Sequence, residues 1–478
     1  MASEKILVWE DDPASALASI EVPAPDLSLP PLPLQITAQQ PPPRLYDKGT
    51  LEFRYWDAAA ALSRGTTYWG ALAPNGTSWE PGSPLPVNLD DPNEDLNAFY
   101  SRNAPTGLNF FHGDGGDGNT VFSGESPDIL CHELGHAVLD ALRPELFDAA
   151  NLESPAFHES FGDMSAILTA LQVPQVRESI LTATGGHIDR NSDLSRLAEQ
   201  LGAAIRERSP DAVDPDCLRN AANSFIFQDP ETLPTSAPAS MLSQEPHSFS
   251  RVFTGAFLEA LAGMVLIRSA NPTSDDLLAV SNAMGGLLVA AVQAAPVVPE
   301  FYSQVAAALI QADAQAGGVF ADALKSAFVR RGILTPQSAV AVSFLQAAAM
   351  SAPMAAITAA ATVPGRVKEL PLQAIDAAQY GLGNTPLFVH VPTQPRRVAA
   401  IASGPGAGTV TPPSSDRSAR VFVEHLMRLG RVDFGTHGTR GAYIAHPRAR
   451  KTHRIEAMNG VLVLKRKLFY CSFCGYVQ

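Results

Sequence analysis

Two imidazoles and a carboxylate stand at a spacing that suits metal chemistry in the segment His132-Glu133-Leu134-Gly135-His136. In a helix, residues i and i+4 lie on one face, so His132 and His136 can reach the same metal ion. Glu133 projects beside that face, where its carboxylate can polarise a metal-bound water as general base. The segment predicts a zinc site with hydrolytic chemistry. Because such a string also arises by chance, the prediction needs a third protein ligand.

The next helical segment offers that third ligand. Ser154 can cap a helix and Pro155 fits its first turn. Glu159 and Asp163 are four residues apart and share a face, so Glu159 can bind the metal while Asp163 accepts the N–H of a ligand histidine. Two acidic residues on a solvated helix face are the simpler alternative. The apolar residues within 164–168 instead predict a buried helix, in which unpaired carboxylates are costly.

The residues around the first motif predict the helix that presents it. Ser126 can cap this helix, Pro127 fits its first turn, and Asp128 suits the positive N-terminal end. Pro144 ends it. The remaining positions are largely apolar, so we expect a central helix over 127–142.

Together these segments resemble the thermolysin-like zinc metalloendopeptidases, gluzincins in which a downstream glutamate completes the HExxH site. The resemblance covers about residues 97–268. Its matched segments are Asn97-Ala-Phe-Tyr100, Asn109-Phe-Phe-His-Gly-Asp-Gly115, 126–138 and 153–163. It implies one catalytic zinc ion with three protein ligands: His132, His136 and Glu159. It also implies that Glu133 is the general base and that Asp163 supports a histidine.

The resemblance extends to groups that bind substrate and the transition state. Leu218-Arg219 precedes His247 at a separation like that of the family, which implies that Arg219 binds a substrate carbonyl. His247 would then stabilise the oxyanion of the tetrahedral intermediate. Glu245 is close enough in sequence to orient His247. In isolation, a helix-capping or core histidine would be the simpler interpretation of His247.

Asn97 and Ala98 match the family's edge strand, which pairs with the substrate backbone. Asn103-Ala104 is a competing match for the same strand. Asp128 matches a calcium-ligand position of the family, but no carboxylate partners for it are evident in the sequence. Calcium is therefore an open and unsupported cofactor here.

Two positions depart from the family pattern. The oxyanion tyrosine of the family falls on Ala150 in this register, and the nearest aromatic residue, Phe147, has no hydroxyl. His158 stands where the family has asparagine. Loss of one oxyanion donor typically costs about 10²–10³ in rate. The missing tyrosine favours an alternative: a non-catalytic or latent gluzincin-fold protein that binds peptide or a partner, held inactive by the missing tyrosine or by the C-terminal domain. A third interpretation is a self-processing enzyme that its C-terminal CxxC domain keeps latent. The intact Glu133 favours the peptidase.

Four cysteines in 478 residues exclude a disulfide framework. Cys471-Ser-Phe-Cys474 has metal-like spacing, but a structural zinc would need further ligands. The candidates are His437, His446 and His453. A redox pair, a thiolate that blocks the catalytic zinc, and plain reduced thiols are the other interpretations. Cys131 and Cys217 are expected to be small core residues.

Changes in amino-acid composition along the sequence divide the chain into three parts. Residues 1–50 hold a Pro-rich N-terminal arm, which predicts an extended segment and not a packed domain. Residues 51–365 form the expected catalytic core, with 51–56 as its first strand. Residues 366–478 form a basic, β-containing C-terminal domain. Helices are expected at 127–142, 155–172, 193–207, 248–268, 275–294, 301–316 and 338–361.

The predicted fold class is α+β. We expect a two-lobed thermolysin-like metalloprotease core, with a strand-rich N-lobe over about 51–150 and a helical C-lobe over about 151–365. The zinc helix lies between the two lobes. A small β-containing domain follows.

The overall charge limits the partners. Lys and Arg number 34 against 48 Asp and Glu, a net charge of −14, which disfavours nucleic acid and leaves a peptide or protein substrate. Residues 416–478 carry 12 basic and 4 acidic side chains. Their excess is either a solvated face or a docking surface for an acidic partner or for the acidic body itself. The sequence predicts no oligomeric state.

The start of the chain carries charges and no apolar h-region, so cytoplasmic location is the default, with export by another route left open. Two long uncharged stretches, 277–298 and 333–365, are rich in Ala and contain polar residues or Pro. We expect packed helices there and not membrane spans.

Overall fold

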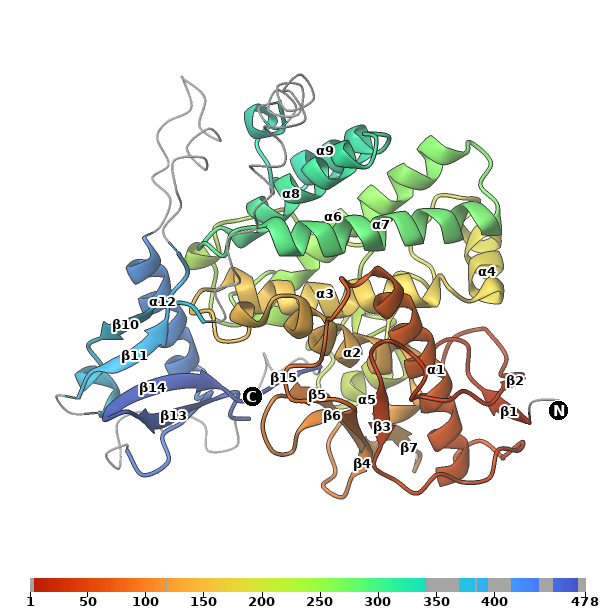
Figure 1. The fold of residues 1–478 in the computed structure, drawn as a ribbon, viewed down its shortest axis with the longest axis horizontal. Helices are drawn as coiled ribbons and strands as arrows, with labels where there is room; N and C mark the ends of the chain where they lie inside the picture. Colours follow the sequence, from red (N-terminus) through yellow and green to blue (C-terminus); the bar gives the residue numbers. More distant parts are fainter. Residues whose placement is uncertain are drawn as a thin grey trace.

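The computed structural model describes residues 4–116, 118–340, 342, 369–382, 385–393, 414–437 and 450–471. Within these residues the chain is a mixed α/β protein with several sheets (Figure 1). Helices form the centre and one side of the molecule, and strands lie below and beside them.

The main sheet of the described residues has six strands. They are β15 (Phe469–Tyr470), β5 (Ala98–Ser101), β6 (Gly107–Asp114), β4 (Leu85–Asp91) and β3 (Leu34–Ile36) in that order, with β7 (Thr120–Phe122) paired to β6. The β5–β6 and β15–β5 pairs are antiparallel, whereas β3, β4 and β6 run parallel. The last described strand thus borders a sheet whose other strands lie between residues 34 and 122.

The expected first strand at residues 51–56 is wrong, because helix α1 (Leu51–Leu72) begins there. Thr50 caps the helix by accepting a hydrogen bond from Phe53 N at 3.2 Å. The helix packs on α2 and on strands of the N-terminal region, so apolar residues cover most of its circumference. A helix that is buried on several sides shows no clear 3.6-residue pattern, and its aromatic density resembles that of a strand.

Two central helices carry the motifs: α2 (Pro127–Leu142) and α3 (Glu153–Ala170). Ser126 caps α2 as expected, accepting from Ile129 N at 3.5 Å. The helices approach closely at a glycine, because a Cβ on Gly135 would lie 2.8 Å from Ser165 Cβ and 2.9 Å from Gly162 Cα. Figure 1 shows α2 between the sheet and the helices stacked above α3.

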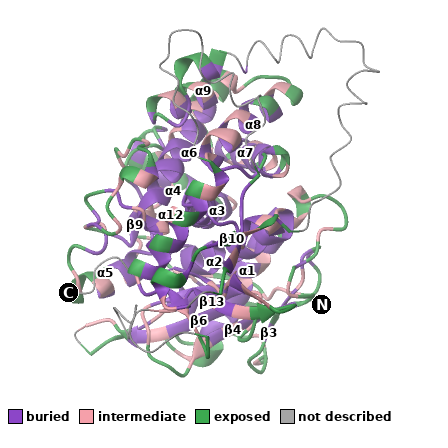
Figure 2. Cartoon of the chain, turned by 90° about the vertical axis from the view of Figure 1, so that its left-hand side faces the viewer, coloured by how far each residue is buried: buried purple, intermediate pink, exposed green. Residues whose placement is uncertain are grey.

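Between residues 174 and 330 the described helices are α4 (Pro174–Thr184), α5 (Glu199–Arg208), α6 (Pro246–Arg268), α7 (Ser274–Ala294), α8 (Phe301–Gln315) and α9 (Ala321–Arg330). The predictions for α6, α7 and α8 are confirmed within two residues. The helix expected at 193–207 begins later, after the short strand β8 (Arg196–Leu197). The sequence analysis missed α4 and α9, and the helix expected at 338–361 falls almost wholly outside the described residues. Figure 2 shows buried residues filling α3 and α6.

Two described helices, α6 and α7, are long and apolar enough to span a membrane by length and composition alone. Their most apolar windows are 78% and 56% buried within the protein. Since the core helices of soluble proteins pass the same test, this is weak evidence for a span.

The N-terminal arm is packed, in contrast to the expectation of an unpacked extended segment. Strands β1 (Lys5–Val8) and β2 (Ile20–Pro23) pair with each other, and β3 joins the main sheet. Ile6 and Leu34 are buried in the main core. Trp9 N donates to Asp57 Oδ1 of α1 at 2.6 Å. The prolines limit helix formation in the arm, but the apolar residues between them are still buried.

The C-terminal region forms its own sheet and core. The described sheet has the order β10 (Leu372–Ile375), β11 (Leu387–His390), β14 (Val461–Arg466), β13 (His453–Met458), β12 (Val432–Asp433), and α12 (Ser415–Arg428) packs on it. Ala150 and Leu152 of the central region join this core. A β-containing C-terminal region is therefore observed.

Part of the basic excess of the C-terminal region faces the acidic body. Lys465 Nζ lies 3.2 Å from Asp148 Oδ2, and Arg417 Nε lies 2.8 Å from Glu231 Oε2. Arg450 pairs with Asp95. These ion pairs favour the docking interpretation, with the body itself as the acidic partner.

Candidate active site

Helices α2 and α3 bring together the three expected metal ligands. His132 and His136 come from α2 and Glu159 from α3, and one ligand atom from each lies within 4.8 Å of the others. The Oε2 atom of Glu159 is 3.4 Å from His132 Nε2 and 3.6 Å from His136 Nε2. All three side chains are buried. The i,i+4 spacing and the close contact of α2 with α3 produce this arrangement.

These ligand atoms have no hydrogen-bond partner among the described residues: His132 Nε2, His136 Nε2 and Glu159 Oε2. Buried polar atoms are normally paired, because an unpaired one costs about 1–3 kcal/mol. A cation at their common centre would satisfy all three atoms. Two imidazole nitrogens and one carboxylate oxygen are a donor set that zinc accepts, with a fourth position left for another ligand. The residues present therefore fit a zinc ion.

Asp163 supports this site from α3. Its Oδ1 atom lies 3.0 Å from His132 Nδ1 and accepts a hydrogen bond from Arg219 Nη2 at 2.8 Å. Burial alone would raise the pKa of Asp163, but the charge of Arg219 and the contact with His132 lower it to about 2. The carboxylate is therefore ionised and can hold His132 in the orientation that points Nε2 at the metal position.

Glu133 lies beside the three ligands and is fully buried. Neither of its carboxylate oxygens has a hydrogen-bond partner among the described residues. Burial raises its pKa to about 8, against the opposing effect of a charge on His132. A divalent cation nearby would lower this pKa, so the carboxylate would titrate in the range that a general base needs.

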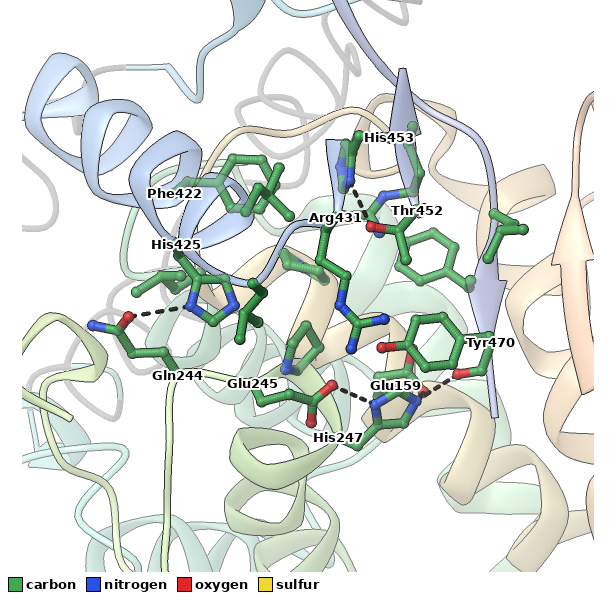
Figure 3. Close-up of a pocket in the computed structure, with 18 residues that line it drawn as sticks. Glu159, Gln244, Glu245, His247, Phe422, His425, Arg431, Thr452, His453 and Tyr470 are labelled. Atoms are coloured by element: carbon green, nitrogen blue, oxygen red, sulfur yellow. Dashed lines mark hydrogen bonds and ion pairs between the residues drawn. The ribbon is translucent and has the colours of Figure 1, made fainter. Parts of the chain in front are cut away.

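His247 reaches the site from the first turn of α6. Its Nδ1 atom lies 2.7 Å from Glu245 Oε1, and its Nε2 atom lies 3.1 Å from Glu159 Oε2 (Figure 3). Glu245 also caps α6 by accepting from Ser248 N at 3.0 Å. Burial would lower the pKa of His247, but the charges of Glu159 and Glu245 hold it well above its usual value. A protonated imidazole can donate a hydrogen bond to an oxyanion.

Arg219 lies on β9 (Arg219–Asn220), which pairs with β8. Besides Asp163, it donates from Nη1 to the carbonyl oxygen of Cys471 at 2.9 Å. Ala98 lies on β5 as expected, and its carbonyl oxygen accepts from Cys471 N at 2.9 Å. Two residues expected to bind a substrate backbone, Arg219 and Ala98, therefore both contact Cys471, the last described residue.

Asn97 is buried, and its Oδ1 atom accepts from Ala98 N at 2.8 Å. This contact is within its own segment and stabilises the start of β5. The competing match, Asn103-Ala104, follows β5, and Ser101 Oγ donates to Asn103 O at 2.9 Å. Of the two matches, only 97–98 adjoins the strand that pairs with the chain end.

Aromatic side chains occupy the region where the resemblance places the oxyanion tyrosine. The ring centroid of Phe469 lies 5.4 Å from that of Phe147 and 4.1 Å from that of His158. Ala150 N donates to His390 O of the C-terminal region at 2.8 Å. Burial lowers the pKa of His158 well below its usual value, so this ring is neutral. Phe147 and His158 thus form an apolar wall, and neither contributes a hydroxyl.

A second cluster of carboxylates lies at the start of α2. Oxygens of Asp12, Asp128 and Glu199 lie within 4.8 Å of one another, all buried. Burial and the nearby carboxylates, Asp11 foremost, raise the pKa of Asp128 well above its usual value. The sequence analysis did not find these partners because Asp12 and Glu199 are far from Asp128 in the chain. The acidic run at 10–12 was the available signal.

The three described cysteines, Cys131, Cys217 and Cys471, are all buried. Cys131 and Cys217 are buried, as expected of small core residues. Cys471 is buried too, and its Sγ lies within 4.8 Å of His132 and Glu133 ligand atoms. Among the described residues, no such cluster contains His437 or His453. Cys474 and His446 lie outside the described residues, so a structural zinc there is not tested.

Comparison with known proteins adds no family assignment. No protein-family model matches the chain, and no curated protein matches it. The case for a function therefore depends on the geometry of the site and on the resemblance of its motifs.

Proposed function

We propose that this protein is a zinc-dependent metalloendopeptidase of thermolysin-like architecture. The observation that carries the proposal is the convergence of three buried ligand atoms on one point, none with a hydrogen-bond partner among the described residues: His132 Nε2, His136 Nε2 and Glu159 Oε2. Glu133 and His247 adjoin this point, one as a candidate base and the other as a candidate oxyanion donor. Groups of these types are rarely assembled in a protein interior without a function.

The proposed architecture has two lobes, with α2 between them. The strands β4 to β7 on one side and the stack of α3, α6, α7 and α8 on the other support it. In this arrangement each lobe contributes part of the site: Ala98 comes from the sheet, and His247 comes from the helical stack.

The proposed reaction is hydrolysis of a peptide bond. Zinc, when bound, supplies Lewis-acid chemistry that lowers the pKa of water and polarises a carbonyl group. Glu133 takes a proton from the attacking water and delivers it to the leaving amine. His247 donates a hydrogen bond to the oxyanion, and Glu245 keeps the imidazole charged and oriented.

The chain's own groups also orient the substrate. Ala98 O accepts an N–H of the peptide backbone, as in strand addition to a sheet edge. Arg219 donates to the carbonyl on the amine side of the cleaved bond, and Asp163 fixes its guanidinium. These contacts use part of the binding energy of the substrate to hold its scissile peptide bond in the orientation needed for attack.

A second candidate is a latent or non-catalytic protein of the same fold. The aromatic wall of Phe147 and His158, which lacks the expected hydroxyl, favours it. So does the chain end that contacts Arg219 and Ala98. The buried Glu133 opposes the non-catalytic version, since a binding protein has little use for an unpaired base beside a metal.

The test combines zinc content with cleavage of a quenched-peptide library. We expect the wild type to bind one zinc ion and to cleave peptides at a low but measurable rate. Glu133→Gln should keep the zinc and lose at least about 10²-fold in rate, because the base is removed. Glu52→Gln, an exposed change on α1, is the control. No bound zinc, or equal rates for Glu133→Gln and the wild type, would contradict the peptidase proposal. Bound zinc without any cleavage would favour the second candidate.

A further inference from the structure

The end of the described chain lies along the sheet edge as a bound peptide would. Strand β15 pairs antiparallel with β5, with Phe469 opposite Tyr100 and Tyr470 opposite Phe99. The next residue continues the pairing through its N–H, which donates to Ala98 O at 2.9 Å. Main-chain pairing of this kind is how many proteins hold extended peptides.

The two carbonyl groups that follow point at the two groups assigned to substrate carbonyls. Tyr470 O lies 2.5 Å from His247 Nε2, and Cys471 O accepts from Arg219 Nη1 at 2.9 Å. Figure 3 shows the imidazole of His247 between Glu245 and the Tyr470 carbonyl. The Tyr470–Cys471 peptide bond therefore occupies the place of the bond to be cleaved.

The side chain of Cys471 would explain why the Tyr470–Cys471 peptide bond is not hydrolysed in the intact protein. Its Sγ lies within 4.8 Å of ligand atoms of both His132 and Glu133, and the residue is 1% exposed. It does not form one such group with His136 and Glu159, so binding to the common ion requires the thiol to move toward them. Hydrolysis requires a water next to Glu133. A thiol at this position takes the space of that water, and thiolate sulfur is itself a good zinc ligand.

Further contacts anchor the strand to both sides of the cleft. The ring of Phe469 stacks on His136 at 4.9 Å between centroids, and the Arg466 guanidinium lies 4.1 Å from the Phe469 ring centre. Arg466 Nε also donates to Phe147 O at 2.8 Å. Arg466 is the last residue of β14, so the C-terminal sheet delivers the strand into the cleft.

We propose that residues 468–471 are an internal inhibitor that keeps the intact protein latent, with the Cys471 thiolate as the fourth ligand of the zinc ion. This inference rests on the proposed peptidase function. Without the thiol, water reaches Glu133 and the strand becomes a substrate. The water oxygen then bonds to the carbonyl carbon of Tyr470, the C–N bond breaks, and the proton moves through Glu133 to the new amine.

The first experiment is cobalt substitution in the full-length protein. Cobalt(II) replaces zinc in such sites, and a thiolate ligand adds a near-ultraviolet charge-transfer band to its visible d–d bands. We expect this band in the wild type and in Cys217→Ala, a buried control. Cys471→Ala should keep the visible bands and lose the near-ultraviolet band. An identical near-ultraviolet spectrum for wild type and Cys471→Ala would overturn the proposed ligand. Absence of visible bands in all three proteins would instead refute the metal site and with it the proposed function.

The second experiment follows the intact mass of the zinc-loaded proteins. Wild type and Cys217→Ala should stay whole, whereas Cys471→Ala should lose residues 471–478 by cleavage after Tyr470. Adding Glu133→Gln to Cys471→Ala should prevent that cleavage. Peptidase activity on a quenched peptide should rise at least about tenfold in Cys471→Ala, because a metal ligand and two backbone hydrogen bonds of the inhibitor are lost. Equal activity and equal mass for wild type and Cys471→Ala would overturn the latency.

Discussion

At the scale of single residues, Asp163 connects two parts of the site. Its carboxylate contacts His132 Nδ1 at 3.0 Å and Arg219 Nη2 at 2.8 Å, with all three side chains buried. One group thus orients His132, a proposed metal ligand, and the guanidinium of Arg219, which donates to the Cys471 carbonyl. The low pKa of Asp163, about 2, keeps it charged at neutral pH.

We predict that Asp163→Asn weakens zinc binding by about 10–100-fold, since the orientation of His132 is lost. The substitution also leaves Arg219 as a buried charge without its partner, which typically costs about 3–5 kcal/mol. Competition with a chelator gives the first quantity and thermal unfolding the second. Asp322→Asn, an exposed change on α9, is the control. An unchanged zinc affinity would show that Asp163 does not position His132.

At the scale of elements, the contact between α2 and α3 sets the distance between the histidines and Glu159. The contact is close at Gly135, where an added Cβ would also meet Phe161 O at 3.1 Å, and at Gly162, where it would meet His132 Nδ1 at 2.6 Å. Because Gly162 Cα and Ser165 Cβ belong to a buried helix, α3 can yield only by moving as a whole. The spacing of the three proposed metal ligands therefore depends on a glycine that takes no part in the chemistry itself.

We predict that Gly135→Ala destabilises the protein by about 1–3 kcal/mol, as overpacking usually does. Separation of α2 from α3 should also weaken zinc binding. Gly286→Ala on α7 is the matched control, since nothing lies within 4 Å of its added Cβ. That change should stabilise the protein by about 0.5–1 kcal/mol through higher helix propensity. Equal melting temperatures for the two variants would refute the close packing.

At the scale of the whole molecule, the C-terminal region closes over the site. His425 of α12 is buried, and its Nδ1 atom lies 3.2 Å from Gln244 Oε1, next to Glu245 (Figure 3). Burial is the largest effect on the pKa of His425; with the charge of Arg431 it outweighs Glu245 and lowers this pKa to about 4. The contact between the C-terminal region and the segment at Gln244 therefore contains a buried imidazole, His425, that is neutral at neutral pH.

This attachment predicts a loss of stability in acid. The unfolded chain binds a proton on His425 below its ordinary pKa of about 6.5, whereas the folded protein resists protonation down to about 4. Stability should fall as the pH drops through this window, by up to about 1.4 kcal/mol per pH unit for this residue. His425→Gln should remove that part of the pH dependence of the melting temperature. His187→Gln, an exposed change, should not. If the melting temperature of His425→Gln falls with pH as steeply as that of the wild type, His425 is not the source of this pH dependence.

The N-terminal arm meets α2 at the carboxylate cluster of Asp12, Asp128 and Glu199. Carboxylate oxygens are the ligands that calcium prefers. We predict that calcium at about 100 times its Kd stabilises the wild type by about 2.7 kcal/mol, measured as a rise in melting temperature that a chelator reverses. Asp12→Asn should abolish most of the rise, and Glu52→Gln should retain it. If calcium does not change the melting temperature, the prediction is wrong. The negative charges of the three carboxyl groups are then neutralised by protons that they share and not by a cation.

The sequence by itself determined the local parts of this protein. The spacing of His132 and His136, the pair Glu159 and Asp163, and the cap at Ser126 all depend on helical periodicity and on neighbours within a few residues. Such features form with little dependence on the rest of the chain, so pattern and spacing were enough to predict them.

The tertiary structure alone decided which distant residues meet. It placed Asp12 beside Asp128, enclosed α1 so that its helical pattern is hidden, and brought Cys471 to His132. These contacts join segments up to several hundred residues apart, and no local pattern encodes the docking of one sheet on another. The placement of the chain end against Ala98 and Arg219 results from how the C-terminal sheet packs on the body, because β14 directs the strand that follows it into the cleft.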